Sequence, residues 1–274
     1  MLGHAGGVHG ADIAVVTGAS RGVGRVLALH LAANGLSVAA LARPSGDLDS
    51  LVDAPGEIVP IPADVTDPAV VRHAFDRVTA QLGPPSVVIT SAGSIDALGP
   101  LVDADPNRWW SSIAVDLRGT MLTAQAALQT MLARRSGRII TMYGNLGDRG
   151  TPNLSAFAAA KAGIARFTES LAAELAGTGV VALCLHPGFV RTPMTERLSW
   201  SDEGRQWLPQ FGERAERHWG DGQAAVQLIG EILAGAADEL SGRIVHAGDD
   251  LADLARRAAA NDELRRLRIV GSDS

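Results

Sequence analysis

The sequence has one cysteine, Cys184, one tyrosine, Tyr143, and one lysine, Lys161, among its 274 residues. A single cysteine cannot form a disulfide within the chain. Cys184 stands in an apolar run, which predicts a small buried hydrophobic side chain. This cysteine usage is typical of a cytoplasmic protein. Residues 1–12 lack the charged and then apolar order of a signal peptide, which agrees with that location.

Long apolar runs and blocks of basic residues are also absent. No apolar run reaches the roughly 18 residues that a transmembrane helix needs, so no membrane partner is predicted. The net charge is −6, and the basic residues are spread along the chain. Binding to nucleic-acid phosphates needs clustered basic residues, so a nucleic-acid partner is not expected. No metal site is predicted either.

What the sequence does contain is a regular alternation of strand and helix signals. Asp67 and Pro68 predict a helix start, and Gly35 predicts a helix end. The predicted strands are residues 13–17, 36–42, 57–62, 86–90, 137–143, 180–185 and 243–246. The predicted helices are residues 22–35, 68–83, 106–113, 117–134 and 155–175.

The strands are mostly uninterrupted apolar runs, which is typical of a parallel sheet covered on both faces. Repeated β-α-β order indicates a doubly wound (Rossmann) α/β sheet with right-handed crossovers. No repeat or linker interrupts the pattern, so residues 1–274 are predicted to form a single domain.

Three segments fall outside this pattern. Residues 1–11 are expected to be a flexible N-terminus, and residues 249–274 to be an arginine-rich C-terminal tail with helical character. Residues 193–220 are expected to be a long irregular loop that acts as a lid on the substrate side. Its tryptophans either suit a flat or aromatic substrate or pack the loop onto the core. They are Trp200, Trp207 and Trp219.

The first strand runs directly into a glycine-rich turn, residues 17–24, which reads TGASRGVG and is followed by a helix. Glycines allow a tight turn and let backbone N–H groups approach a pyrophosphate at the helix N-terminus. The turn therefore predicts a dinucleotide site, with a purely structural turn as the alternative. The predicted binding residues are Gly18, Ser20, Arg21, Gly22, Val23 and Gly24.

The end of the second strand indicates which dinucleotide is bound. NAD-specific sites place an acidic residue here for the ribose 2′-OH, whereas this chain has Arg43, with Arg21 in the turn. Two guanidinium groups suit a 2′-phosphate. The sequence therefore favours NADP(H) over NAD(H), with a solvated strand-end charge as the alternative for Arg43.

Together with three further motifs, the turn resembles the short-chain dehydrogenase/reductase family over residues 12 to 248. The motifs are Asp64-Val65, then SAG at 91–93 where the family has Asn-Ala-Gly, then PGFVRT at 187–192. The resemblance implies a seven-stranded parallel sheet and a homodimer or homotetramer packed through helices 117–134 and 155–175. It also implies dinucleotide contacts from Asp64, Val65, Ser91, Ala92, Gly93, Pro187, Gly188, Val190 and Thr192.

The catalytic signature of that family is incomplete in this chain. The family has a proton-donating tyrosine four residues before a lysine, a serine thirteen residues before the tyrosine, and an asparagine further upstream. Here these positions are Phe157, Gly144 and Asp116, and only Lys161 matches. The lysine is implied to bind the nicotinamide ribose. Every other basic residue is arginine, so a lysine at this one position favours that role over an accidental surface lysine.

Three groups are candidates for the missing proton chemistry, each with a structural alternative. Tyr143 neighbours the serine position. Strand alternation, however, points its side chain to the face opposite Gly144, so the alternative is a packed or surface tyrosine. Asp116 is a candidate acid or the cap of a helix start. His186 precedes the PG motif and is otherwise a satisfied strand-end histidine. The opening at Gly144 is alternatively a place for a water molecule or the substrate.

These features predict an atypical NADP(H)-dependent ketoreductase or dehydrogenase. Its expected substrate is a small molecule, an aromatic or polyketide-like carbonyl compound or a quinone. One alternative is a non-redox enzyme on the same fold, such as a dehydratase, isomerase or cyclase. The other is a cofactor-binding pseudoenzyme that acts as a partner subunit.

Overall fold

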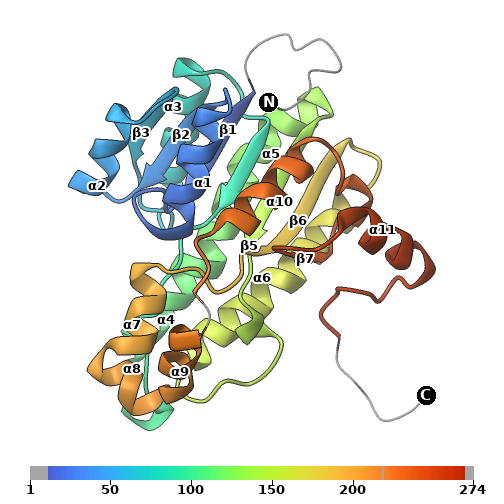
Figure 1. Cartoon of the computed structure of the whole chain (residues 1–274). Helices are drawn as coiled ribbons and strands as arrows, with labels where there is room; N and C mark the ends of the chain where they lie inside the picture. The colour runs from blue at the N-terminus through green and yellow to red at the C-terminus, as the bar shows by residue number, and fades with distance from the viewer. Residues whose placement is uncertain (1–11, 218, 269–274) are drawn as a thin grey trace.

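The computed structural model describes residues 12–217 and 219–268. The flexible N-terminus predicted at 1–11 lies outside the described residues. A seven-stranded parallel sheet, in the order β3-β2-β1-β4-β5-β6-β7, forms the centre of the molecule and confirms the predicted fold class (Figure 1). The strands are β1 (Ile13–Thr17), β2 (Ser37–Ala42), β3 (Ile58–Pro62), β4 (Val87–Thr90), β5 (Gly137–Met142), β6 (Val180–His186) and β7 (Ile244–His246).

Helices cover both faces of the sheet, as the apolar strands predict. One layer contains α1 (Gly22–Ala33), α10 (Gln223–Leu233) and α11 (Leu251–Ala260). The other contains α3 (Pro68–Gln81), α5 (Gly119–Arg134) and α6 (Ser155–Glu174) (Figure 1). Asp67 caps α3 by accepting from the N–H groups of Ala69 and Val70, with Pro68 in the first turn, as predicted.

The strand order reverses between β1 and β4, so the chain leaves these neighbouring strands in opposite directions. In a doubly wound sheet this reversal opens a crevice at the carboxyl ends of the strands, where ligands bind. All seven strands are parallel, so their carboxyl ends meet at this same edge. The predicted site motifs lie at this edge because each of them directly follows a strand.

The prediction of an irregular loop at 193–220 is wrong, because most of the segment is helical. It forms α7 (Pro193–Trp200), α8 (Asp202–Trp207) and α9 (Pro209–Arg217), which gather beside α4 (Pro106–Ile113) below the sheet (Figure 1). Thr192 and Thr195 form a capping box at the start of α7, and the Ser201 side chain caps α8. These caps support helices too short to show a clear periodicity. We call residues 193–217 the lid.

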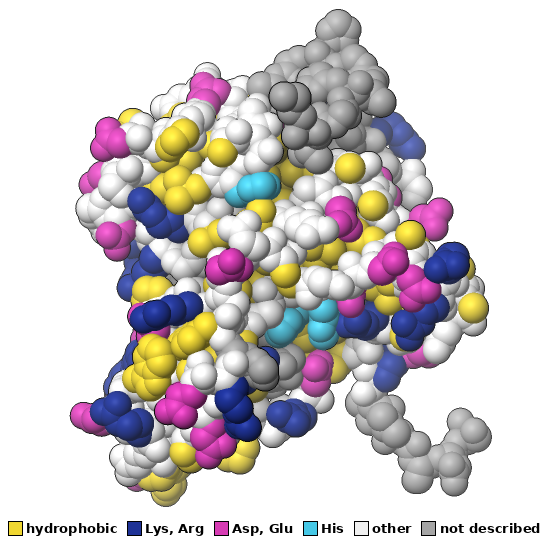
Figure 2. All heavy atoms as spheres, viewed as in Figure 1, with side chains coloured by type: hydrophobic (Ala, Val, Ile, Leu, Met, Phe, Trp, Pro, Cys, Tyr) yellow, Lys and Arg dark blue, Asp and Glu magenta, His cyan; other side chains and the backbone are white. Residues whose placement is uncertain are grey.

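Some elements were not predicted. They are α2 (Gly46–Asp49) and α10, together with the 3₁₀ turns η1 (Ser50–Asp53), η2 (Leu101–Asp103), η4 (Asn145–Gly147) and η5 (Asp238–Leu240). A π-helical turn, η3 (Ala114–Arg118), separates α4 from α5 where the prediction began a helix at residue 117. Among the described helices, none is long and apolar enough to cross a membrane. Figure 2 shows acidic and basic side chains interspersed over one face of the molecule.

The C-terminal tail is helical at α11 and then runs along the free edge of the sheet up to residue 268. The Ile244 N–H of the edge strand donates to the Arg265 carbonyl (2.8 Å). Buried Arg243 donates to the carbonyl oxygens of Asp262 and Leu264, each at 2.7 Å. The tail therefore covers an edge that would otherwise present unpaired backbone groups.

Candidate functional site

The glycine-rich turn after β1 has a backbone that only glycine adopts without strain. Gly18 and Gly22 have φ angles of +65° and +60°. A Cβ atom added at Gly24 would lie 2.5 Å from the Gly18 carbonyl oxygen, so α1 begins in direct contact with the turn. This packing leaves the first N–H groups of α1 pointing out of the turn, where an anion can bind.

The structure brings three of the four predicted dinucleotide segments together. A Cβ atom added at Gly18 would lie 2.8 Å from Ala92, whose N–H donates to Thr17 Oγ1 (3.2 Å). On the other side of the turn, a Cβ atom added at Gly22 would lie 3.4 Å from Thr192. The turn, the SAG segment and the PGFVRT segment thus lie together at the edge where a doubly wound sheet binds its ligands. We call this region the cleft, and the turn with Arg21 and Arg43 its phosphate end.

The two arginines predicted to select NADP(H) are both exposed at the phosphate end. Arg43 directly follows β2 and is near Asp64. The pKa of Asp64 is lowered, mainly by the Thr66 N–H (2.8 Å) and also by the positive charge of Arg43. Val65 packs against Gly119 at the start of α5, where a Cβ atom would lie 2.7 Å from the valine side chain.

Sequence reasoning missed a third arginine at this end. The Arg25 guanidinium donates to the Asp47 carbonyl (2.7 Å) and to Ser50 Oγ (3.1 Å), and so ties α1 to the segment after β2. The only sequence signal for Arg25 is its position one turn into the helix that follows the glycines. Its partners lie more than twenty residues away, so the sequence alone could not identify them.

At the other end of the cleft, which we call the inner end, Asp116 and Lys161 form a buried ion pair. Lys161 Nζ lies 2.8 Å from Asp116 Oδ1, and their side chains are 8% and 0% exposed. Asp116 Oδ2 accepts from the Ser94 N–H (2.7 Å). Burial raises the pKa of Asp116, while Lys161 and the Ser94 N–H favour the ionised form.

This geometry corrects two structural alternatives. Asp116 caps no helix start, because it lies within the π-helical turn and bonds across to the loop after β4. Lys161 is not a surface lysine, because its ammonium also donates to the Met142 carbonyl (3.2 Å) and lies 5.2 Å from the centre of the Phe157 ring.

Gly144 and Phe157 face one another at the inner end. A Cβ atom added at Gly144 would lie 3.5 Å from the Phe157 ring and 3.7 Å from Lys161 Cγ, which is ordinary van der Waals contact. Phe157 is buried in an apolar cluster that joins α6 to the lid. The buried members of this lid cluster are Ile95, Leu154, Phe157, Leu198, Leu208 and Phe211.

Tyr143 points away from this group, as strand alternation predicts. It is buried in a different cluster with Ile164, Cys184 and Ile244, and its hydroxyl donates to Asp148. Burial and the Asp148 carboxylate raise the pKa of Tyr143 well above its ordinary value. The structure therefore does not bring Tyr143 to Lys161. Cys184 is buried and free, as predicted, and burial raises its pKa to about 11.

His186 ends β6 beside His246 of β7, with ring centres 4.9 Å apart. Its Nδ1 accepts from the Gly188 N–H (3.2 Å), so the ring fixes the backbone of the PG motif. Burial, and then the neighbouring His246 and Arg214, lower the pKa of His186 to about 4. The imidazole is therefore neutral near pH 7.

The predicted lid aromatics pack largely against one another. Phe189 and Trp219 stack in parallel at 5.1 Å, and Trp200 meets Trp219 edge-on at 5.2 Å. The Arg191 guanidinium lies 5.7 Å from the centre of the Trp200 ring and 5.9 Å from that of Trp219. Trp207 packs against the lid cluster that contains Phe157. Hydrophobic side chains gather in this region of the surface (Figure 2).

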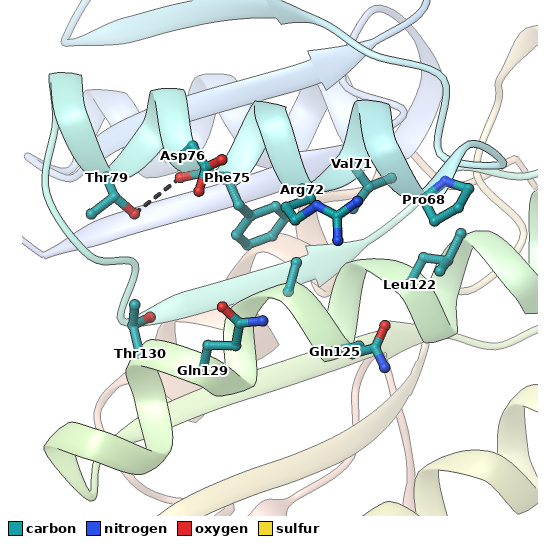
Figure 3. Close-up of a pocket in the computed structure, with 11 residues that line it drawn as sticks. Pro68, Val71, Arg72, Phe75, Asp76, Thr79, Leu122, Gln125, Gln129 and Thr130 are labelled. Carbon is teal, nitrogen blue, oxygen red and sulfur yellow. Dashed lines mark hydrogen bonds between the residues drawn. The ribbon is translucent and has the colours of Figure 1, made fainter.

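A separate groove lies between α3 and α5, in one of the two helical layers that cover the sheet. Figure 3 shows Arg72 reaching between the two helices, with Gln125 and Gln129 along α5. None of the predicted dinucleotide or catalytic residues lines it. The groove lies on the outer side of α5, one of the two helices expected to pack between subunits. Assembly through α5 and α6 stays a prediction.

Comparison with known proteins gives consistent matches. The sequence pattern of the family described as short chain dehydrogenase matches residues 12–203. The 3-oxoacyl-acyl-carrier-protein reductase FabG of Escherichia coli K12 is 31% identical over 237 residues, which cover 85% of this chain and 94% of that protein. A short chain dehydrogenase of Pseudocercospora fijiensis is 38% identical over 187 residues, covering 66% of this chain and 60% of that protein.

Solved structures agree with the fold. A variant of the actinorhodin polyketide ketoreductase with NADPH superposes with a TM-score of 0.77 at 23% identity, covering 89% of this chain and 98% of that one. A candidate NAD(P) dependent gluconate 5-dehydrogenase from Beutenbergia cavernae with bound NADP has a TM-score of 0.76 at 29% identity, covering 87% and 96%.

Proposed function

The chain belongs to the short chain dehydrogenase family, and we propose that it is an NADP(H)-dependent oxidoreductase with an altered proton-donating set. The observation that carries the proposal is the phosphate end of the cleft. Its close-packed glycines fit a pyrophosphate, and Arg21 and Arg43 stand exposed where a 2′-phosphate would be recognised. Solved relatives with bound NADPH or NADP support this choice.

A bound nicotinamide supplies or accepts the hydride, and the protein supplies binding and orientation. At the phosphate end, the N–H groups that open α1 would hold the pyrophosphate. At the inner end, Lys161 is held by Asp116 and Met142, and its ammonium keeps a third hydrogen for a ribose hydroxyl. Gly93 and Ser94 border the same pair: a Cβ atom added at Gly93 would lie 3.3 Å from Asp116 Oδ1, and the Ser94 N–H donates to Oδ2.

The proposed substrate is an aromatic or polyketide-like carbonyl compound or a quinone. The apolar lid cluster around Phe157 and the neighbouring tryptophans support a flat, apolar substrate. FabG and the polyketide ketoreductase, which resemble this chain, are named for acyl-chain and polyketide reduction. A reactive carbonyl such as a quinone depends least on the missing tyrosine, because its reduction needs less help from a general acid.

A cofactor-binding protein without redox turnover is the second candidate. One observation favours it. Phe157, on α6, is buried against the lid, in the position where the family places its proton donor. A non-redox enzyme has less support, because Tyr143 and His186 are engaged with Asp148 and Gly188 rather than brought to Lys161. The cytoplasmic location stays a prediction of the sequence.

Cofactor titration tests the NADP(H) assignment. NADPH and NADH are titrated into the wild-type protein, into Arg43→Gln, and into Arg72→Gln, which changes an exposed arginine on α3 far from the cleft. A lost charge-assisted contact weakens binding by about tenfold or more. We expect that loss for NADPH with Arg43→Gln, with NADH and the control unchanged. Equal NADPH affinity in all three proteins would contradict NADP(H) selection by Arg43.

Turnover separates the two candidate functions. The loaded wild-type protein is mixed with a panel of ketones and quinones while the absorbance of reduced nicotinamide is followed. Stoichiometric oxidation supports the oxidoreductase. Tight binding with no oxidation across the panel supports the cofactor-binding protein without turnover. No binding of either dinucleotide contradicts both.

A further inference from the structure

The net charge of the inner end differs from what the family pattern implies. A neutral asparagine at position 116 would leave the lysine as a buried positive charge. Asp116 instead adds a negative charge, and its Oδ1 lies 2.8 Å from Lys161 Nζ. The inner end of this chain therefore holds a neutral ion pair in place of a net charge of +1.

The surroundings of the pair keep it neutral. Burial alone would raise the pKa of Asp116, and the ammonium at 2.8 Å and the Ser94 N–H donor on the other oxygen oppose this by favouring its ionised form. The Met142 carbonyl, which is uncharged, is the further partner of Lys161. The Cys184 thiol lies within reach of the charge of Lys161, and with a pKa of about 11 it is neutral near pH 7.

Burial makes this balance matter. Solvent and salt screen buried charges poorly, so an unbalanced charge there acts over several ångströms. Lys161 and Asp116 are two of the few buried charged side chains in the described part of the chain. A nicotinamide ring is positively charged when oxidised and uncharged when reduced. A net positive inner end would therefore bind the reduced form in preference to the oxidised one.

We propose that Asp116 determines which redox form of the dinucleotide the protein accepts. By cancelling the charge of Lys161, it lets the oxidised dinucleotide bind with an affinity close to that of the reduced one. Asp116 acts through Lys161 and is in this sense a positioning and specificity residue rather than a proton donor. The inference rests on the proposed function, because it requires a nicotinamide dinucleotide in this cleft.

Binding measurements on the full chain test this inference without any turnover. Dissociation constants for NADPH and NADP+ are measured for the wild type, Asp116→Asn and the double variant Asp116→Asn with Lys161→Met. Asp116→Asn leaves Lys161 unbalanced and is expected to weaken NADP+ relative to NADPH by about tenfold. The double variant removes both charges and is expected to restore the wild-type ratio, even where both affinities fall.

The outcomes are separable. An Asp116→Asn ratio equal to that of the wild type overturns the inference and leaves the proposed function standing. A wild type that binds neither dinucleotide overturns the proposed function first. Circular dichroism and thermal unfolding establish that each variant is folded. Where Asp116→Asn does not fold, Asp116→Ser, which also removes the carboxylate charge, gives the same comparison, and an unchanged ratio there overturns the inference.

Discussion

The two ends of the cleft are built in different ways. The phosphate end is made by the backbone: Gly18 and Gly22 adopt positive φ angles, and Gly24 lies too close to a carbonyl oxygen for any side chain. The inner end is made by side chains, chiefly the Asp116–Lys161 pair and the Phe157 ring. A backbone site is fixed by the fold itself, whereas a side-chain site can change its chemistry while the fold persists.

The inner end shows how such a change is accommodated. A Cβ atom added at Gly144 would make only ordinary van der Waals contacts, so the glycine at this position does not relieve a clash. Phe157 loses a hydroxyl but gains a place in the apolar lid cluster. Asp116 brings a charge that would be costly to bury alone, and Lys161 pairs with it. The departures at Phe157 and Asp116 are thus stabilised by packing and by charge pairing.

The largest effect on activity is expected from restoring the family signature at the inner end. Phe157→Tyr combined with Gly144→Ser returns a proton donor and a second hydroxyl to the inner end without touching the phosphate end. General acid catalysis contributes about 10²–10⁴-fold. We therefore expect reduction of simple ketones with NADPH to rise by about that factor, measured as initial rates.

The single variants serve as controls for the double variant. Gly144→Ser has room for its side chain and is expected to leave stability unchanged. Phe157→Tyr places a hydroxyl beside the apolar lid cluster and is expected to destabilise slightly. A folded double variant that binds NADPH and stays inert on ketones would mean that the inner end differs by more than its missing hydroxyls.

A smaller effect is expected from a change confined to the phosphate end. Gly24→Ala adds a Cβ atom 2.5 Å from the Gly18 carbonyl oxygen and must shift the turn. Overpacking of this kind costs about 1–3 kcal/mol, which corresponds to roughly 5- to 150-fold if the cost falls on NADPH affinity. Gly230→Ala in α10 is the matched control, because its added Cβ atom meets nothing within 4 Å. Unchanged NADPH affinity in Gly24→Ala would show that the turn is not what holds the cofactor.

Local signals explain why the phosphate end and the sheet could be predicted from the sequence. The apolar strands, the Asp67-Pro68 helix start and the glycines of the turn each act over a few residues, so neighbours in sequence suffice to identify them. The lid was harder to predict. Its helices are too short for periodicity, and they depend on caps and on contacts with Phe157, far away in the sequence.

The inner end could be predicted only in part, because its contacts join distant positions. The sequence identified Asp116, Gly144 and Phe157 as the changed positions and Lys161 as the retained one. It could not show that Asp116 pairs with Lys161, because the contact depends on the π-helical turn that carries Asp116. For the same reason the packing of His186 against His246 of the neighbouring strand was not anticipated.

The smallest expected effect is an acid sensitivity of the PG motif, which His186 holds. His186 has a pKa of about 4 in the folded protein against an ordinary value of 6.5. The unfolded chain therefore takes up a proton first as the pH falls. The contribution of the neutral imidazole to the free energy of unfolding is complete above about pH 6.5 and is lost progressively down to about pH 4. Allowing for partial exposure, the loss is about 2 kcal/mol.

Urea unfolding between pH 7 and pH 4.5 measures this loss in the wild type, in His186→Asn and in His73→Gln. His73 is exposed on α3 and serves as the control. We expect a shallower pH dependence of the free energy of unfolding in His186→Asn alone. Identical profiles in all three proteins would contradict the role given to His186.

Hydrogen exchange connects this acid effect to the two ends of the cleft. Protonation of His186 Nδ1 removes the acceptor of the Gly188 N–H, so the backbone of the PG motif loses a contact that holds it. Within residues 12–217 and 219–268, no hydrogen bond joins the turn at 18–24 to a histidine, so the turn is expected to keep its glycine packing in acid. Exchange at Gly188 should therefore accelerate toward pH 4.5, relative to intrinsic rates, while exchange in the turn does not. Equal acceleration at both places would mean that acid loosens the whole sheet edge and that the two ends do not respond independently.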